Sequence, residues 1–488
     1  MASGRCKCIL VFSIGSFLLL LGAIVGGLWG IIYDKMLRME LVLTNTSRSY
    51  QMWKDIPIPI YMEFYMFNWT NAAAVVANSS IKPHFEQMGP YVFREYHHRV
   101  NMTWNSNDTI TYQQVRSWHF QPDMSNGSLS DNVTNLNMVA ATVAFQTRFM
   151  SYFKKIGVDV LMRATRSRLY VTKTVKELLF DGYDDKLLDL VKNITHKIPF
   201  KRFGYFVERN NSASADGIFN MWTGASDLHQ LGMMEQWNYK HNTGLYNQPC
   251  DLVHGSSGDL WPPVTGRNSV HIFASDLCFS LQLYSAGAEE AHGLSGLRFV
   301  GDNRTLDNGK HFSETRCQCV GDCQPSGTLN ASACRFGSPL FVSFPHFYLA
   351  DSSYLTPLQG LKPDKNHEFA IVLQPETGMP LHVEAKLQLN VLVERWPHLS
   401  VFKHVPQRMY VPMLWFAQLA DFPPDLAAEV RTLVAIPAIG RGTLFGIAGL
   451  GAFILLVGAL VTWKHGWSAE TQDHEPLLPA KEGACISE

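Results

Sequence analysis

The chain has 488 residues, of which 46% are hydrophobic, and a formal net charge of −1 at pH 7. A polypeptide of this size and apolar content can bury a large core, and its balanced charge argues against bulk binding to nucleic acid. The apolar residues are not spread evenly, because one long apolar run lies near each end of the chain.

The first apolar run, residues 9–33, contains no charged side chain. As a helix it would be about 37 Å long, at about 1.5 Å per residue, and the hydrocarbon core of a membrane is about 30 Å thick. A cleaved signal peptide is the alternative, but its apolar region is only about 7–15 residues long and ends at a small-x-small cleavage site. Here the run continues through Gly30 into Ile31 and Ile32, which predicts an uncleaved transmembrane helix after a short N-terminal segment, residues 1–8.

Three glycines of this run, Gly22, Gly26 and Gly30, are four residues apart and share one helix face. Small residues at this spacing let two membrane helices approach closely. Glycine is also common in membrane helices for other reasons. The pattern therefore suggests a homo-oligomer formed through this face, without requiring one.

Helical patterns concentrate in residues 135–195. Apolar residues recur there at intervals of three and four, which is typical of an amphipathic helix; they are Met138, Ala141, Phe145, Phe149, Tyr152 and Ile156. Thr174 and Glu177 have the spacing of a capping box ahead of Leu178, which predicts a second helix start.

Six of the nine cysteines lie in residues 250–334, and they are Cys250, Cys278, Cys317, Cys319, Cys323 and Cys334. An even number of clustered cysteines is typical of disulfide bonds in an oxidising compartment, although six cysteines allow 15 pairings. A zinc site is the alternative, but Cys-x-Cys-x-x-x-Cys is not a familiar spacing of structural zinc ligands. We therefore expect disulfides and no metal.

Residues 383–393 alternate between apolar and polar side chains, with Val383, Leu387 and Val391 on one side and Glu384 and Asn390 on the other. This period of two predicts a long strand with one buried and one solvated face, which favours an antiparallel sheet or barrel. Turns rich in proline and glycine recur without a fixed repeat period. The middle of the chain is thus predicted to be one large α+β domain, a β framework with a helical insertion.

The second apolar run, residues 443–463, is bounded by Arg441 and Lys464 and predicts a second transmembrane helix. A buried core helix is the alternative, but the remaining residues, 464–488, are too short and polar to cover one. Two spans place both termini on one side of the membrane and residues 34–442 on the other.

Asparagine sequons indicate which side this is. Eleven Asn-x-Ser/Thr sites lie between the two spans: Asn45, Asn68, Asn78, Asn101, Asn107, Asn126, Asn132, Asn193, Asn210, Asn303 and Asn330. This density is typical of a glycosylated surface in the secretory lumen or outside the cell. The sequence therefore predicts a two-pass membrane glycoprotein with both termini in the cytosol.

Four stretches resemble the class B scavenger receptors, the family of the fatty-acid translocase, the high-density-lipoprotein receptor, lysosomal integral membrane protein type 2 and insect Croquemort. They are residues 52–59 (MWKDIPIP), 89–95 (GPYVFRE), 177–183 (ELLFDGY) and 343–347 (SFPHF). The resemblance covers nearly the whole chain, including both spans and the cysteine cluster.

This resemblance implies an ectodomain with an antiparallel β-barrel core, a hydrophobic tunnel through it and a helical-bundle apex where ligands bind. It also implies the pairs Cys250–Cys317, Cys278–Cys334 and Cys319–Cys323. The last loop is shorter here than in most relatives, so a Cys317–Cys319 bridge remains an alternative.

The segment expected at the apex is strongly basic. Between Arg148 and Lys176 there are eight basic residues and one acidic residue, Asp159. We expect this segment to bind polyanionic ligands, such as modified lipoproteins, anionic phospholipid on apoptotic cells or microbial surfaces. The alternative is an ordinary solvated helix face. The candidate binding residues are Lys154, Lys155, Arg163, Arg166 and Arg168.

The cytosolic segments contain two short signals. Asp473, Leu477 and Leu478 match an acidic dileucine motif, a signal read by endosomal sorting adaptors, and the motif resembles the tail signal of the lysosomal family member. Cys6 and Cys8, beside the inner membrane face, are candidates for palmitoylation or are plain thiols. These signals predict residence at the plasma membrane and in endosomes or lysosomes.

The leading hypothesis is a scavenger receptor that binds lipids and lipoprotein-like particles and mediates lipid uptake or transfer. The alternatives are a lysosomal receptor that sorts a soluble hydrolase and a sensory or adhesion co-receptor. Histidine is absent between His119 and His196, so the expected apex lacks the usual acid-sensitive side chain. The chain has no Gly-x-Ser-x-Gly, P-loop or His-Glu-x-x-His motif, so we expect no enzymatic activity and no cofactor.

Overall fold

The computed structural model describes residues 2–195, 200–405 and 407–469 and contains two compact units. The first unit is a helical pair made of the described residues up to 37 and from 430 onward. The second is a β-rich domain made of residues 38–429.

The helical pair consists of α1 (Ala2–Leu41) and α7 (Pro424–Ala469). Both helices are long and apolar enough to cross a membrane, over Ile9–Leu41 and Pro424–Lys464. The two helices contain the predicted spans, residues 9–33 and 443–463. In the sequence, α1 continues past residue 33 to Leu41, and α7 begins before residue 443, at Pro424.

Close packing of α1 on α7 explains the glycine spacing. A Cβ atom on Gly22 would lie 2.6 Å from the backbone nitrogen of Ala448, and one on Gly451 would lie 2.4 Å from that of Leu19. Side chains cannot fit at such distances, so glycine permits the close approach. Gly26 and Gly30 likewise face α7, at Phe445 and Arg441. The glycine face suggested for self-association thus packs within the chain.

The β-rich domain is built on one sheet of 13 strands. In chain order these are β1 (Ile60–Trp69), β2 (Phe85–Trp104), β3 (Thr109–Phe120), β6 (Ile218–Trp222), β7 (Met234–Trp237), β8 (Ser269–Ala274), β9 (Phe279–Ala291), β10 (Leu294–Val300), β11 (Leu329–Asn330), β12 (Leu340–Ser343), β13 (Ala370–Leu373), β14 (Pro380–Val393) and β15 (Met409–Asp421).

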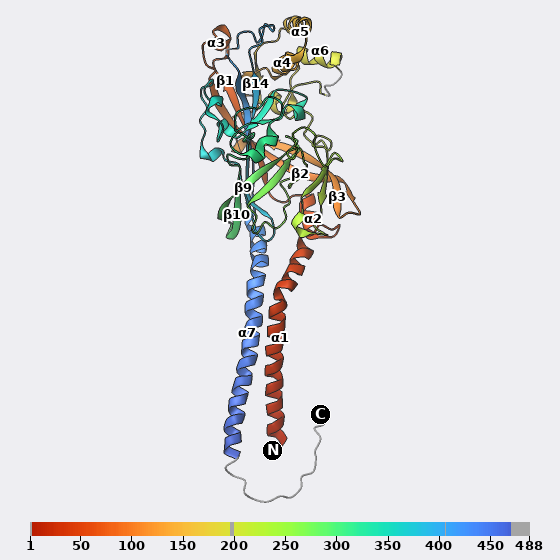
Figure 1. Cartoon of the computed structure of the whole chain (residues 1–488), viewed down its shortest axis with the longest axis vertical. Coiled ribbons are helices and arrows are strands. Elements are labelled where there is room, and N and C mark those ends of the chain that lie inside the picture. The colour runs from red at the N-terminus through yellow and green to blue at the C-terminus, as the bar shows by residue number, and fades with distance from the viewer. Residues whose placement is uncertain (1, 196–199, 406, 470–488) are drawn as a thin grey trace, which may run out of the picture. The chain divides into compact units, whose positions relative to one another are not determined.

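The sheet order is β7-β6-β3-β2-β1-β15-β14-β13-β10-β9-β8, with β12 attached to β14 and β11 to β12. All the strand pairings between neighbours in this sheet are antiparallel, and the first and last strands, β1 and β15, are neighbours. Ser256 forms bridges beside both edge strands, to Met233 near β7 and to Ile272 in β8. The sheet is therefore a nearly closed barrel, as the family resemblance implied (Figure 1).

The prediction for β14 was right about the strand and only partly right about its solvated face, because Glu384 keeps exposed surface but Gln388 and Asn390 do not. Gln388 and Asn390 are fully buried, and their side chains hydrogen-bond to β12 and to the residues after it. The Gln388 side chain accepts from the backbone N–H of His346 at 2.6 Å, and the Asn390 side chain donates to Ser343 Oγ at 2.9 Å. Hydrogen bonds to neighbouring segments replace the expected water.

The helical insertion contains α4 (Met138–Gln146), α5 (Tyr152–Ala164) and α6 (Lys186–Thr195), with a small sheet of β4 (Asn132–Leu136) and β5 (Tyr170–Thr174). The three helices lie together at one end of the domain (Figure 1). Two further helices, α2 (Arg48–Lys54) and α3 (Ala72–Ala77), flank β1 in the sequence.

The single amphipathic helix predicted from Met138 to Ile156 is wrong. The helix ends at Gln146, a short 3-10 turn follows, and Met150 adopts an extended conformation before α5 begins. The apolar residues after this break no longer face the core. The capping box is confirmed, because the Thr174 N–H donates to Glu177 Oε2 at 2.9 Å and the Glu177 N–H donates to Thr174 Oγ1 at 3.2 Å.

Three disulfides join the cysteine cluster: Cys250–Cys317, Cys278–Cys334 and Cys319–Cys323. These are the pairs that the family resemblance implied, and Cys317 is not bonded to Cys319. The first two disulfides join cysteines that are 67 and 56 residues apart in sequence. Cys278, in the second of them, lies between the barrel strands β8 and β9.

Candidate functional site

A cavity of about 790 Å³ lies inside the β-rich domain. Its wall includes Met138 and Leu188, from α4 and α6, and also Ile58 and Ala420, beside the start of β1 and the end of β15. The cavity thus extends from the helical end of the domain toward the strand ends that adjoin α1 and α7 in the sequence. Its volume is within the range of about 300–1,000 Å³ that is typical of small-molecule sites.

Most of the cavity wall is apolar. The side of β14 predicted to be buried supplies Val383, Ala385, Leu387 and Leu389, which face the cavity instead of a solid core. This explains why Val383, Ala385 and Leu389 keep some exposed surface although they belong to a central strand.

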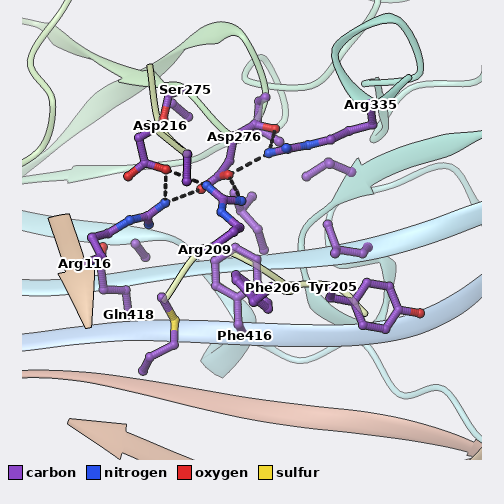
Figure 2. A pocket seen from close by; sticks show the side chains of 18 of the residues that line it. Arg116, Tyr205, Phe206, Arg209, Asp216, Ser275, Asp276, Arg335, Phe416 and Gln418 are labelled. Carbon is purple, nitrogen blue, oxygen red and sulfur yellow. Dashed lines mark hydrogen bonds and ion pairs between the residues drawn. The ribbon is translucent and has the colours of Figure 1, made fainter. Parts of the chain in front are cut away.

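One part of the wall is charged, and we call its five ionised residues the charged wall: Arg116, Arg209, Asp216, Asp276 and Arg335 (Figure 2). Asp216 Oδ1 accepts from Arg116 Nη2 and from Arg209 Nη2, both at 2.6 Å. Asp276 forms ion pairs with Arg335 at 2.6 Å, with Arg116 at 3.3 Å and with Arg209. Three guanidinium groups therefore share two carboxylates.

The charged wall is partly removed from water. The side chains of Asp216 and Arg116 are 4% and 11% exposed, whereas those of Asp276 and Arg335 are 34% and 30% exposed. Burial raises the pKa of Asp276, but Arg209 and Arg116 lower it more, so that it lies well below its ordinary value. Asp276 is therefore ionised at neutral pH. Burial lowers the pKa of Arg335, and Arg209 adds to this effect while Asp276 opposes it.

A second buried group of charges adjoins the charged wall and consists of Glu95, His97, Arg99 and Asp259. His97 Nε2 lies 3.0 Å from Glu95 Oε1, and its Nδ1 lies 3.6 Å from Asp259 Oδ1. Arg99 pairs with Asp259. Burial lowers the pKa of His97, but the two carboxylates raise it to about 9, so this group is balanced at two positive and two negative charges.

Apolar side chains project from the helical end of the domain, and we call them the α5 surface: Phe149, Tyr152, Phe153, Ile156 and Val160. The side chains of Phe149 and Phe153 are 88% and 84% exposed. Lys154 and Lys155 lie among them on α5. Monomeric proteins seldom expose such a group of large apolar residues unless it contacts another molecule.

The predicted basic residues differ in how free their charges are. Lys154 lies on α5 and Arg166 and Arg168 in the turn after it; all three are exposed and have no ion pair within the described part of the chain. Lys155, on the same helix, is half-buried. Arg163, at the end of α5, pairs with Asp159.

Two other basic residues of the segment are also neutralised. Lys173 and Lys176 pair with Glu177 and Asp181, at 3.7 and 2.9 Å. These two acids lie just beyond the segment whose charges we counted in the sequence, so the count overstated the available positive charge.

Asp159 anchors α5 to the domain. It is buried, and its Oδ1 accepts from the backbone N–H of Ser400 at 2.6 Å. Burial raises the pKa of Asp159, but the Ser400 and Arg163 hydrogen bonds lower it below the ordinary value. The one acidic residue of the segment therefore has a structural contact that its sequence position did not reveal.

A histidine does lie at the α5 surface, contrary to the expectation from the sequence. The imidazole of His398 packs edge-on against Tyr152, with ring centroids 5.2 Å apart. His398 is exposed and comes from the segment after β14, more than two hundred residues farther along the chain.

The predicted glycosylation sites are mostly accessible. Nine of the eleven asparagines are exposed, whereas Asn68 and Asn330 are half-buried. The side-chain oxygen Oδ1 of Asn68 also accepts a hydrogen bond from the Thr134 N–H at 2.9 Å. These two sites are therefore the poorest expected acceptors.

Several predicted residues cannot be placed. Asp473, Leu477 and Leu478 lie outside the described residues. Cys6 and Cys8 fall within α1, but their side chains lie outside the described part of the chain. Among the described residues, no group of three or more His, Cys, Asp or Glu side chains could hold a metal ion.

Comparison with known proteins identifies the family. The model of the CD36 family matches residues 13–462. The chain belongs to the CD36 family. Its relatives include "Protein peste" of Drosophila melanogaster, which is 35% identical over 89% of this chain and 77% of its own length. "Scavenger receptor class B member 1" of Bos taurus is 30% identical over 90% of this chain and 87% of its own length.

A lysosomal relative of the CD36 family is almost as similar. "Lysosome membrane protein 2" of Homo sapiens is 28% identical, with 88% of each chain covered. Membership of the CD36 family confirms the predicted resemblance and the barrel fold, and it identifies a two-pass membrane protein of a receptor family, not an enzyme.

Proposed function

We propose that this protein is a scavenger receptor that captures lipid-bearing and anionic ligands on the α5 surface and moves lipid through the cavity toward the membrane. The observation that carries the proposal is the largely apolar cavity, whose wall contains residues of α4 and α6 at the helical end and residues next to the membrane helices in sequence. A lipid tail inside it gains roughly 0.8 kcal/mol for each CH₂ group removed from water.

The α5 surface has the chemistry needed for capture. Exposed aromatic rings such as Phe149 and Phe153 can insert between lipid chains, and Lys154, Arg166 and Arg168 can pair with phosphate or carboxylate groups. This combination supports modified lipoproteins, anionic phospholipid and microbial surfaces as ligands.

Blocking the cavity tests the transfer step. In cells that express the full chain, Ala385→Trp would fill the cavity where β14 lines it. We expect lipid transfer from bound particles to fall severalfold while particle binding is retained. Ala74→Trp is the matched control, because Ala74 is exposed on α3. Unchanged transfer, or equal loss of binding and transfer, would refute a separate conduit.

Membrane orientation is part of the proposal. We place residues 34–442 outside the cytosol, with glycans on the exposed sequons, and both termini inside. A peptide glycosidase should increase the gel mobility of the protein, and protease added to intact cells should digest the β-rich domain. Unchanged mobility together with digestion of only the termini would contradict this topology.

A second function is a lysosomal receptor that carries a soluble hydrolase and releases it in acid. The exposed aromatic surface where His398 packs against Tyr152 favours it, because such a surface suits a protein partner. If so, His398→Gln should bind a hydrolase equally at pH 7.4 and pH 5, whereas the unchanged chain should release it at pH 5. Pull-down of lysosomal hydrolases at both pH values distinguishes this function from lipid capture.

A further inference from the structure

Two stacked histidines lie on the outer side of the barrel. His346 follows β12 and His367 precedes β13, and their ring centroids are 4.6 Å apart with the planes 12° from parallel. His367 also packs edge-on against Trp415 of β15, at 5.7 Å. Phe416 lines the cavity, so its neighbour Trp415 points away from the cavity. The histidine pair is therefore separate from the cavity and its charged wall.

The segment that carries His367 is held to the barrel by polar contacts, and we call residues 359–367 the strap. Of its nine residues, all of which the structure describes, none is buried. Gln359 forms a parallel bridge to His84, and Lys386 Nζ donates to the Asn366 carbonyl at 2.9 Å. A segment with so little buried apolar surface depends on its hydrogen bonds and opens easily when they are lost.

Two further hydrogen bonds of the strap end on the histidine rings. The Lys362 N–H donates to His346 Nδ1 at 3.1 Å, and the Asp364 N–H donates to His367 Nδ1 at 3.1 Å. The other ring nitrogen of His346, Nε2, lies 2.7 Å from Gln87 Oε1 and donates to it. Both rings therefore act as neutral imidazoles with Nδ1 as the acceptor.

A proton on Nδ1 would break these bonds. A charged imidazolium has two N–H donors and no acceptor, so each ring would then present an N–H to the backbone N–H that it now receives. Two opposed donors cannot form a hydrogen bond. Protonation of His346 and His367 is thus incompatible with the observed position of the strap.

The surroundings of the two rings favour their neutral form. The ionisable residues around them are His84, Glu86, Lys362, Asp364 and Lys386. β1 and β15 face them only with the uncharged rings of Phe67 and Trp415. Burial, and the neighbouring His367, lower the pKa of His346 from 6.5 to about 4. Burial also lowers the pKa of His367, an effect that Asp364 opposes and Lys386 increases.

The backbone at His346 is strained and is held by the same contacts. His346, Phe347 and Leu349 have left-handed φ angles of 53°, 59° and 57°, although none of them is glycine. Such conformations persist only where the surroundings enforce them. Here the His346 N–H donates to Gln388 at 2.6 Å and the ring donates to Gln87. Loss of the ring contacts would let this segment relax, which favours the open form.

We infer that the strap is released in acid, because protonated His346 and His367 cannot hold it on the outer wall of the barrel. Its stability is complete above pH 6.5 and falls as the pH decreases toward 4, since both histidines bind protons less readily in the closed state. Release uncovers the side of Trp415 that His367 covers. It requires neither lipid in the cavity nor a ligand on the α5 surface, so it is independent of the proposed function.

Amide hydrogen exchange of the full chain in detergent, at pH 7.4 and pH 5, tests this release. After correction for the intrinsic effect of pH on exchange, protection of residues 361–367 should fall about twentyfold or more at pH 5, as the depressed pKa of His346 requires. Protection of β1 and β15 should stay the same, because release is local.

Asparagine variants separate the histidines from other groups. The side-chain oxygen of asparagine can accept at the place of Nδ1 at any pH, so His346→Asn with His367→Asn should keep the strap protected equally at both pH values. His367→Asn alone changes only the half-buried ring and should lose part of the pH response. His229→Asn is the matched control, because His229 is exposed outside the strap and should leave the response intact.

Three results would overturn the inference. Equal corrected protection of the strap at both pH values in the unchanged chain would show that acid does not release it. The same loss in His367→Asn as in the unchanged chain, or in the double variant, would assign the response to other groups. Parallel loss of protection in β1 and β15 would show global unfolding. Each of these results leaves lipid transfer through the cavity untouched.

Discussion

The α5 surface and the charged wall each bring aromatic rings and basic groups close together, in opposite settings. Lys154 lies among the exposed rings of the α5 surface, whereas Arg209 of the charged wall lies over the buried ring of Phe206. Exposed charges are screened and contribute little to stability, while buried charges depend strongly on their partners. Changes at the charged wall should therefore affect folding, and changes at the α5 surface should affect binding alone.

The strongest test of this contrast is Asp216→Leu. It removes one of the two carboxylates that Arg116 and Arg209 share and leaves Asp276 to three guanidinium groups, and breaking a buried pair costs about 3–5 kcal/mol. Thermal unfolding of the full chain in detergent should show a large loss of stability. Asp184→Leu is the control, because the Asp184–Arg202 pair is exposed and should cost at most about 1 kcal/mol. Equal losses would contradict the contrast.

The second test is the dependence of stability on pH. Glu95 and Asp259 raise the pKa of buried His97 from 6.5 to about 9, despite the opposing effect of burial. The stabilisation from protonated His97 is therefore complete below pH 6.5 and is lost as the pH rises to 9, on the order of 1.4 kcal/mol for each pKa unit. Denaturant unfolding between pH 6 and 9 measures this loss, which His97→Gln should lack.

The third test concerns the α5 surface. Phe149→Ser combined with Phe153→Ser should weaken binding of anionic lipid vesicles by about 2 kcal/mol, which is typical of aromatic residues central to an interface. The melting temperature should stay the same, because both rings are more than four-fifths exposed. Tyr239→Ser removes a ring elsewhere that is 70% exposed and should leave binding intact. A drop in melting temperature would show that the rings support the fold.

The smallest expected effect comes from charge alone. Lys154→Glu with Arg168→Glu should slow association with anionic vesicles and reduce its salt dependence, at a cost of about 1 kcal/mol or less. Lys365→Glu, at another exposed position, is the control. Arg163 is unsuitable for this test, since a glutamate there would face the buried Asp159. Association rates at two ionic strengths provide the measurement.

The sequence predicted those features that depend on neighbouring residues. The two membrane helices, the antiparallel β framework and the Thr174–Glu177 capping box each follow from local composition or spacing. The helix predicted across residues 147–151 failed because periodicity alone does not reveal where a helix breaks.

The charged wall could not be predicted because its residues are far apart in sequence. Arg116, Asp276 and Arg335 come together only when the barrel closes. The same is true of His398, which tertiary folding places beside Tyr152 of α5, and of Asn390, which hydrogen-bonds to Ser343 of β12. Single charged residues scattered along a chain carry no sign of such a cluster.

The pairing of β1 with β15 has a consequence for how this protein can be cut. Because a membrane helix precedes one of these strands and follows the other, a single proteolytic cut in any loop between them leaves both fragments anchored. The fragments would also stay joined along this pair of strands, whose register runs from Ile60–Ala420 to Met66–Leu414. Release of a soluble domain from the membrane would therefore require two cuts, one beside each membrane helix.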